Sequence, residues 1–122
     1  GDTMKFPLFF ENSRLPLLLS KFSPIEIGAI TLGPFIFSRG TMSVRTRNHE
    51  YIHWEQYKET LVFGFLLLYV LFYIIGLVKY RSGSLAYYNI PFEREAYDND
   101  KNLGYIFHRK RWSWIQYLRK EE

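Results

Sequence analysis

The sequence predicts a mainly α-helical protein that is associated with a membrane. Three observations support this class: one fifth of the 122 residues are aromatic (20%), residues 61–78 contain no charged side chain, and no Gly or Pro interrupts residues 41–63. An aromatic-rich composition together with one long apolar stretch is typical of membrane-associated chains, and the length corresponds to one domain. Because residues 1–3 read as a remnant of an expression vector, we take the single domain to be residues 4–122.

The N-terminal third contains the β-structure that we expect. Residues 24–40, "PIEIGAITLGPFIFSRG", alternate apolar with polar or glycine positions before a Gly33-Pro34 pair, which favours a turn. They predict a short β-hairpin or two edge strands. Such a segment either caps the core or offers an exposed strand edge to which an extended peptide can add.

A helix is expected from about residue 43. Ser43 or Thr46 can act as its N-cap, because either hydroxyl can accept a hydrogen bond from a backbone N–H of the first turn. Within "RNHEYIHWEQ", residues 47–56, His49 and His53 are four positions apart. They therefore lie on the same face of this helix.

This spacing predicts a zinc site. Two imidazoles at i and i+4 can bind one tetrahedral zinc, whereas Glu50, directly after the first histidine, can contact the zinc-bound water but not the metal. Zinc lowers the pKa of its water to about 7, and a carboxylate at this position can accept the proton during attack on a carbonyl. In this composition the HExxH pattern is expected only about 0.005 times by chance, although two histidines on one helix face can also be purely structural.

Residues 61–78, "LVFGFLLLYVLFYIIGLV", form the predicted hydrophobic membrane segment. Its length approaches the roughly 20 residues that cross a bilayer core, and its apolar side chains surround the helix instead of forming one stripe. We expect a helical hairpin that turns near Gly64, with Gly76 as a second weak point. The alternative is one continuous membrane helix followed by an extended return segment.

A second polar helix is expected after the membrane segment. In "IPFEREAYDND", residues 90–100, Pro91 suits the first turn of a helix, and Glu93, Glu95 and Ala96 then lie within that helix. One explanation for these carboxylates is that they complement the helix dipole.

The HExxH motif and the later "FEREA" segment, residues 92–96, together resemble the gluzincin zinc metalloproteases, and most closely the integral-membrane CAAX-type and heat-shock-type proteases. The resemblance implies that His49, His53 and Glu93 bind zinc and that Glu50 is the general base. The paired NHExxH and FEREAY motifs are also similar to those of small bacterial membrane proteins. The resemblance covers the two motif helices and not the rest of the chain.

Two departures from the family pattern have consequences. Tyr97 stands where the family has an aspartate that supports the metal ligands, so Asp98 or Glu95 would have to replace it. A single membrane crossing by the apolar segment would place Glu93 on the opposite side from both histidines. A three-ligand site therefore requires Glu93 to lie on the same side of the membrane as Thr46.

The C-terminal segment, residues 102–120, mixes basic side chains with aromatic rings. This composition predicts an interfacial helix whose rings lie at the headgroup level and whose Lys and Arg side chains contact anionic phosphates. The net charge of +4 also permits nucleic-acid binding, but the sequence carries no nucleic-acid motif, so we expect no nucleic-acid partner. We expect His108 to be interfacial, with a role as an oxyanion donor near the zinc as the alternative.

Two functions remain open from the sequence alone. The first is a minimal membrane-embedded zinc metallopeptidase, a hydrolase that uses Zn²⁺ and Glu50 to cleave a peptide or a membrane protein. The second is a non-catalytic membrane scaffold or assembly subunit that keeps the helix pair, with or without metal. Both include membrane lipid as a contact, and both are compatible with an oligomer.

Overall fold

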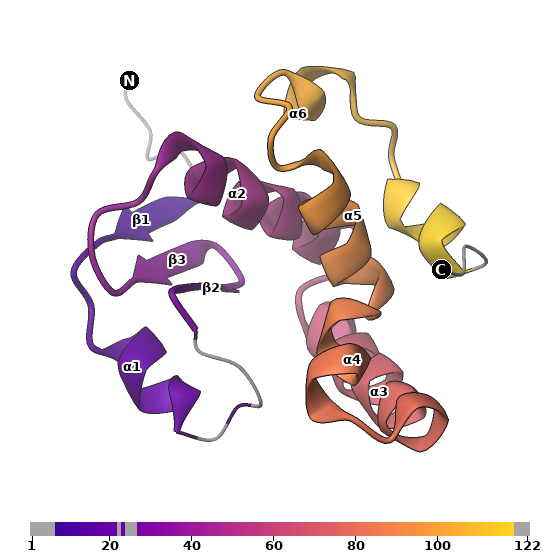
Figure 1. Ribbon diagram of the computed structural model, residues 1–122. Coiled ribbons are helices and arrows are strands. Elements are labelled where there is room, and N and C mark those ends of the chain that lie inside the picture. The colour runs from indigo at the N-terminus through magenta and orange to yellow at the C-terminus, as the bar shows by residue number, and fades with distance from the viewer. Residues whose placement is uncertain (1–6, 22, 24–26, 119–122) are drawn as a thin grey trace.

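Helices make up most of the structure, as the sequence predicts, and a small sheet lies at the N-terminal end. The computed structural model describes residues 7–21, 23 and 27–118. In chain order its elements are β1 (Leu8–Phe10), α1 (Leu15–Ser20), β2 (Ala29–Leu32), β3 (Phe35–Ser38), α2 (Val44–Glu59), α3 (Phe63–Tyr80), α4 (Gly83–Tyr88), α5 (Pro91–Asn99), α6 (Tyr105–His108) and the 3-10 helix η1 (Ser113–Leu118). Figure 1 shows α2 between the sheet on one side and the later helices on the other.

The strands β2 and β3 form the predicted hairpin. They pair antiparallel with Thr31 opposite Ile36, and Gly33 makes the turn with a φ of 61°, which glycine adopts at least cost. The sequence does not predict β1, because three residues are too few to show an alternating pattern. This strand pairs parallel with β3, so β2 is left at the edge of the sheet. Residues 24–26, the first part of the predicted hairpin, lie outside the described residues.

Helix α2 begins where the sequence predicts. The Ser43 hydroxyl accepts a hydrogen bond from the Thr46 N–H at 3.1 Å, so Ser43 and not Thr46 is the N-cap. The helix ends at Glu59, and the next residues change the direction of the chain because Leu61 and Val62 have positive φ values of 60° and 63°.

The turn that we expected near Gly64 therefore lies slightly earlier, and it does not produce the expected hairpin. Only the first turns of α3 lie against α2, where the Phe65 ring stacks on Tyr57 with 3.9 Å between centroids. Further along, α3 packs on α4: a Cβ at Gly76 would lie 2.9 Å from Ala86. Gly76 is thus a point of close helix contact and not a break. From Phe63 onward the apolar segment is one continuous helix, and the return segment contains helix α4 where the alternative expected extended chain.

The return of the chain through α4 and α5 brings Glu93 back to α2. Phe92, in the first turn of α5, stacks on Phe65 with 4.4 Å between ring centroids. Trp114 of η1 closes the cluster at 4.7 Å from Phe92. Because Tyr57 belongs to α2 and Phe65 to α3, this aromatic core joins α2, α3 and α5 and holds Glu93 beside the α2 histidines.

The C-terminal segment differs from the single interfacial helix that we expected. It consists of the two short helices α6 and η1, and Trp114 and Tyr117 of η1 are buried in the protein. Arg109, between the two helices, has only 3% of its side chain exposed. Phe107 and Trp112 remain exposed. Some of the aromatic and basic side chains of this segment are therefore buried in the core, where they pair with buried partners. Residues 119–120 of the segment lie outside the described residues.

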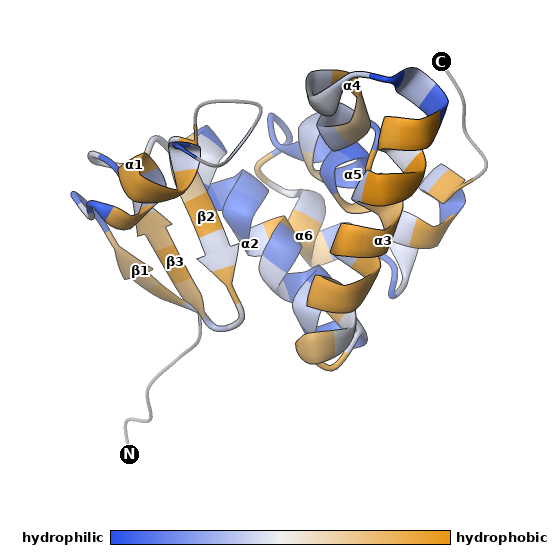
Figure 2. Ribbon diagram, turned by 90° about the horizontal axis from the view of Figure 1, so that it is seen from below, coloured by the Kyte–Doolittle hydropathy of each residue, from blue (hydrophilic) through white to orange (hydrophobic). Residues whose placement is uncertain are grey.

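Helix α3 is long and apolar enough to cross a membrane. It has 18 residues and a mean hydropathy of 2.0, and only 11% of it is buried inside the protein. Leu67 and Val78, for example, are 71% and 76% exposed. In Figure 2 the ribbon of α3 is coloured mostly as hydrophobic, in contrast to the largely hydrophilic α2.

Candidate metal centre

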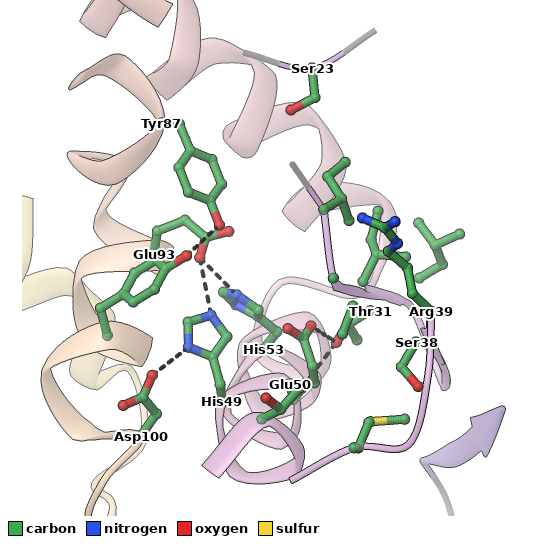
Figure 3. A pocket seen from close by; sticks show the side chains of 18 of the residues that line it. Ser23, Thr31, Ser38, Arg39, His49, Glu50, His53, Tyr87, Glu93 and Asp100 are labelled. Atoms are coloured by element: carbon green, nitrogen blue, oxygen red, sulfur yellow. Dashed lines mark hydrogen bonds and ion pairs between the residues drawn. The ribbon is translucent and has the colours of Figure 1, made fainter. Parts of the chain in front are cut away.

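The HExxH motif lies on the buried face of α2, and the side chains of His49, Glu50 and His53 are all buried there. Pro91 starts α5 at its first position, which places Glu93 in the first turn, buried and directed at α2. One ligand atom each from His49, His53 and Glu93 lies within 4.8 Å of the other two. Figure 3 shows the three side chains converging from α2 and α5.

Two of the three distances within this group are close to those expected around a tetrahedral metal. Glu93 Oε1 lies 3.3 Å from His49 Nε2 and 3.1 Å from His53 Nε2. Ligands about 2.0–2.1 Å from a tetrahedral zinc are separated from one another by roughly 3.3 Å. Two imidazole nitrogens and one carboxylate oxygen are also a typical ligand set of catalytic zinc, with one position left for water or substrate. The residues present therefore fit the metal that the sequence predicts.

Each histidine has its second ring nitrogen occupied by another partner. His49 Nδ1 lies 2.9 Å from Asp100 Oδ2, and His53 Nδ1 lies 2.8 Å from Gln56 Oε1. Because both partners are acceptors, each Nδ1 carries the hydrogen. In the neutral rings the lone pairs are then on the Nε2 atoms, which face Glu93.

The supporting carboxylate is not one of those that we expected. Asp98 is exposed, and Glu95 contacts Gln56 and not a histidine. Asp100, which caps the end of α5, takes this role because it lies seven residues after Glu93, two helical turns along the same face. Arg45 Nε donates to its other oxygen at 2.8 Å, which fixes the carboxylate. The i+7 spacing from Glu93 was the sequence signal that could have identified it.

The electrostatics of the site follow from the close pairing of His and Glu. Burial by itself lowers the pKa of His53, but the charge and hydrogen bond of Glu93 outweigh it and raise this pKa to about 9. Burial also lowers the pKa of His49, but the hydrogen bond to Glu93 and the charges of Glu50 and Glu93 together outweigh it and raise this pKa. Burial would raise the pKa of Glu93, but the facing histidines hold it well below its usual range. Without metal, protons on the rings thus neutralise the carboxylate, and a cation must displace them.

Glu50 lies in the same cavity but outside the three-ligand group. Its Oε1 accepts a hydrogen bond from the Thr31 hydroxyl of β2 at 2.7 Å, and Figure 3 shows the carboxylate between His53 and Thr31. The Tyr57 hydroxyl in turn donates to the Thr31 carbonyl at 2.8 Å, so the edge strand is attached to α2 at Glu50 and at Tyr57. These contacts hold the Glu50 side chain beside the histidines. Its role as a general base stays a prediction.

Two tyrosines contact the site, and sequence reasoning missed one of them. The Tyr69 hydroxyl of α3 donates to Glu93 Oε2 at 2.7 Å; nothing in an apolar run marks one tyrosine as a site residue. Tyr97 does not replace the family's aspartate, since its ring packs against His49 with 4.5 Å between centroids and its hydroxyl pairs with Tyr87. His108 is exposed and does not line the cavity.

The cavity that contains these groups has a volume of about 970 Å³. One wall is the hairpin, with Ile30 and Leu32 of β2, and the opposite wall is the face of α3 that carries Leu66 and Val70. The metal-ligand group and Glu50 form the floor between them. The chain matches no family model, and neither a curated protein nor a solved structure matches it.

Proposed function

We propose that this protein is a membrane-associated zinc-dependent hydrolase that cleaves peptide bonds. The observation that carries the proposal is the approach of His49 Nε2 and His53 Nε2 to one oxygen of Glu93, at 3.3 and 3.1 Å, in a cavity that also contains Glu50. This ligand set is also the one implied by the resemblance of the sequence to gluzincin metalloproteases. Zinc bound there would supply a Lewis acid and activate a water for attack on a carbonyl.

Glu50 is the proposed general base. A general base has to be held in one orientation, and the Thr31 hydroxyl at 2.7 Å orients the Glu50 carboxylate. Tyr69 has a related role at the ligand Glu93: it donates to Oε2, which leaves Oε1 directed at the two histidines.

The walls of the cavity favour an extended, partly apolar substrate next to a membrane. The edge strand β2 borders one side, and an edge strand has backbone groups that an extended peptide can pair with. The other wall is α3, whose apolar surface, 11% buried, suits lipid. We therefore propose that α3 lies in the membrane and that the substrate is a peptide or a membrane-protein segment.

The experiment that tests the function compares Glu50→Gln with the parent. The amide keeps the shape of the side chain but does not accept the proton at neutral pH, so we expect zinc content and thermal stability to be retained while peptide cleavage falls about 10²- to 10⁴-fold. Glu55→Gln is the matched control, because Glu55 lies on the same helix but pairs with Lys58. Cleavage by Glu50→Gln at the parental rate would eliminate the hydrolase mechanism and leave the scaffold function.

A further inference from the structure

Gln56 lies fully buried between the metal ligand His53 and the helix α5. Its Nε2 has two hydrogens, and both are used: one acceptor is the Phe92 carbonyl at 3.0 Å and the other is Glu95 Oε1 at 2.9 Å. The Oε1 of Gln56 is therefore directed the other way, to His53 Nδ1 at 2.8 Å. The amide has one orientation that satisfies all its groups.

Glu95 in turn is held by a cation from a distant part of the chain. Arg109 Nε and Nη2 donate to its two oxygens at 2.6 and 3.0 Å, and the Tyr105 hydroxyl adds a bond of 2.6 Å. The side chains of Glu95 and Arg109 are 0% and 3% exposed. Arg109 also forms a bidentate pair with Glu59 of α2, at 2.7 and 3.0 Å. Arg109, Tyr105 and Gln56 all donate to this buried carboxylate, so Glu95 acts as a hydrogen-bond acceptor.

We propose that Gln56, Glu95 and Arg109 act as a positioning relay, which fixes the His53 ring with its hydrogen on Nδ1 and its lone pair on Nε2. Through this relay the C-terminal segment, which carries Arg109, determines the tautomer and orientation of a metal ligand. The steps follow from donor and acceptor roles alone. Arg109 holds Glu95 as an acceptor, Glu95 attracts the Nε2 end of Gln56, and the remaining Oε1 of Gln56 can only accept from His53. The alternative tautomer would place two lone pairs face to face between His53 and Gln56.

The relay rests on the proposed metal site only in its last step, in which the lone pair of His53 Nε2 binds the metal. It also differs from a purely structural role for the same residues, in which Arg109 would tie the C-terminal segment to α2 and α5 without affecting His53. A structural role predicts lower stability with unchanged ring chemistry. The relay predicts a changed position of the hydrogen on His53 and a weaker metal site.

The test uses Gln56→Met, which keeps the length of the side chain but removes its polar atoms. In the full chain we would measure zinc affinity by chelator competition and the two ring nitrogens of His53 by ¹⁵N NMR. Loss of a group that orients a metal ligand commonly costs about 10- to 100-fold in affinity, and we expect a loss in this range together with loss of the Nδ1–H signature. Glu55→Gln is the control, because Glu55 lies on the same helix but pairs with Lys58; its zinc affinity should stay within about threefold of the parent.

A single and a double variant test the order of the relay. Recovery of zinc affinity in the double variant would also show that the loss in the single variant is not caused by unfolding. Gln56→Glu alone places two carboxylates in contact at positions 56 and 95, and we expect weaker zinc binding. Combining it with Glu95→Gln exchanges the amide and the carboxylate, so that residue 56 again accepts from His53 and residue 95 donates to residue 56. The double variant should regain at least tenfold in zinc affinity over Gln56→Glu.

The outcomes separate the two proposals. If the parent binds zinc but Gln56→Met and the exchanged pair leave both the affinity and the His53 signature unchanged, the relay is wrong and the proposed function stands. If the parent binds no zinc, the proposed function is wrong. The relay is then decided in the zinc-free protein above the pKa of His53: a neutral ring with hydrogen on Nδ1 in the parent, lost in Gln56→Met, supports it, and an unchanged ring overturns it.

Discussion

The inner face of α2 and the outer face of α3 have opposite chemistry. On α2 the buried side chains include Asn48, His49, Glu50, His53 and Gln56. The following helix instead exposes Leu67 at 71% and Val78 at 76%. Buried polar groups need partners, and exposed apolar faces need a partner that is not water.

The contrast shows that the two helix faces are stabilised in different ways. The α2 face is stabilised by specific pairs, such as His49 with Asp100 and His53 with Gln56, and each of these needs a precise direction. The α3 face needs only length and hydropathy. Single substitutions should therefore have large, residue-specific effects on α2 and graded, position-tolerant effects on α3.

The largest effect is expected where the polar face would hold its metal. Replacing His53 with Ala removes one ligand nitrogen, so zinc affinity should fall by more than the roughly 100-fold that is typical of losing an orienting group alone. Zinc should then no longer raise the thermal midpoint, because a ligand stabilises only the state that binds it. Chelator competition and melting with and without zinc are the measurements. Zinc binding by His53→Ala with parental affinity would exclude the three-ligand site.

A charge on the apolar face should disturb membrane association and little else. We expect Leu67→Asp to move the protein from the membrane to the soluble or aggregated fraction, because an acidic residue in a membrane helix costs up to roughly 2.5–3.5 kcal/mol, the value at its centre. Leu103→Asp is the control: Leu103 is 53% exposed and lies between α5 and α6. Equal membrane fractions for the two variants would mean that lipid does not cover α3.

The contact between α3 and α4 gives a smaller effect that depends on shape and not polarity. A Cβ at Gly76 would lie 2.9 Å from Ala86, so Gly76→Val should destabilise the fold by about 1–3 kcal/mol through overpacking. At Gly64 the nearest atom, Cβ of Thr60, is 3.4 Å away, and Gly64→Ala should be neutral or slightly stabilising. Denaturant unfolding of both variants tests whether the return of the chain depends on this glycine.

The smallest expected effect is the change in the unfolding free energy of the zinc-free protein per pH unit. The pKa of His53 is raised from 6.5 to about 9, so between these values the folded state holds a proton that the unfolded state has lost. Stability should then fall as pH rises through this window, by at most about 1.4 kcal/mol per pH unit for one proton. Zinc affinity should rise over the same range, because zinc competes with that proton. A zinc-free stability that increases from pH 7 to 9 would contradict the pairing of His53 with Glu93.

Local features of the chain were readable from the sequence because they depend on neighbours within one or two turns. The i, i+4 spacing brings His49 and His53 together on α2, the Ser43 hydroxyl caps that helix, and Gly33 allows the β2–β3 turn. The apolar run predicts a helix, and α3 is long and apolar enough to cross a membrane. In each case a backbone hydrogen-bond pattern or a periodicity acts over a short distance, and the rest of the fold does not change it.

The remaining features were decided only by the tertiary structure, because they depend on how helices far apart in the sequence cross. Asp100 instead of Asp98 or Glu95 supports His49, and Tyr69 reaches Glu93 from α3. The turn at Leu61 and Val62 and the close Gly76–Ala86 contact set the path along which α5 returns to α2. Arg109 looks like a membrane-surface base in sequence, yet it is buried against Glu59 and Glu95. A buried charge is tolerated only where its partners converge, and that convergence is set by packing between segments about 50 residues apart, which no local pattern contains.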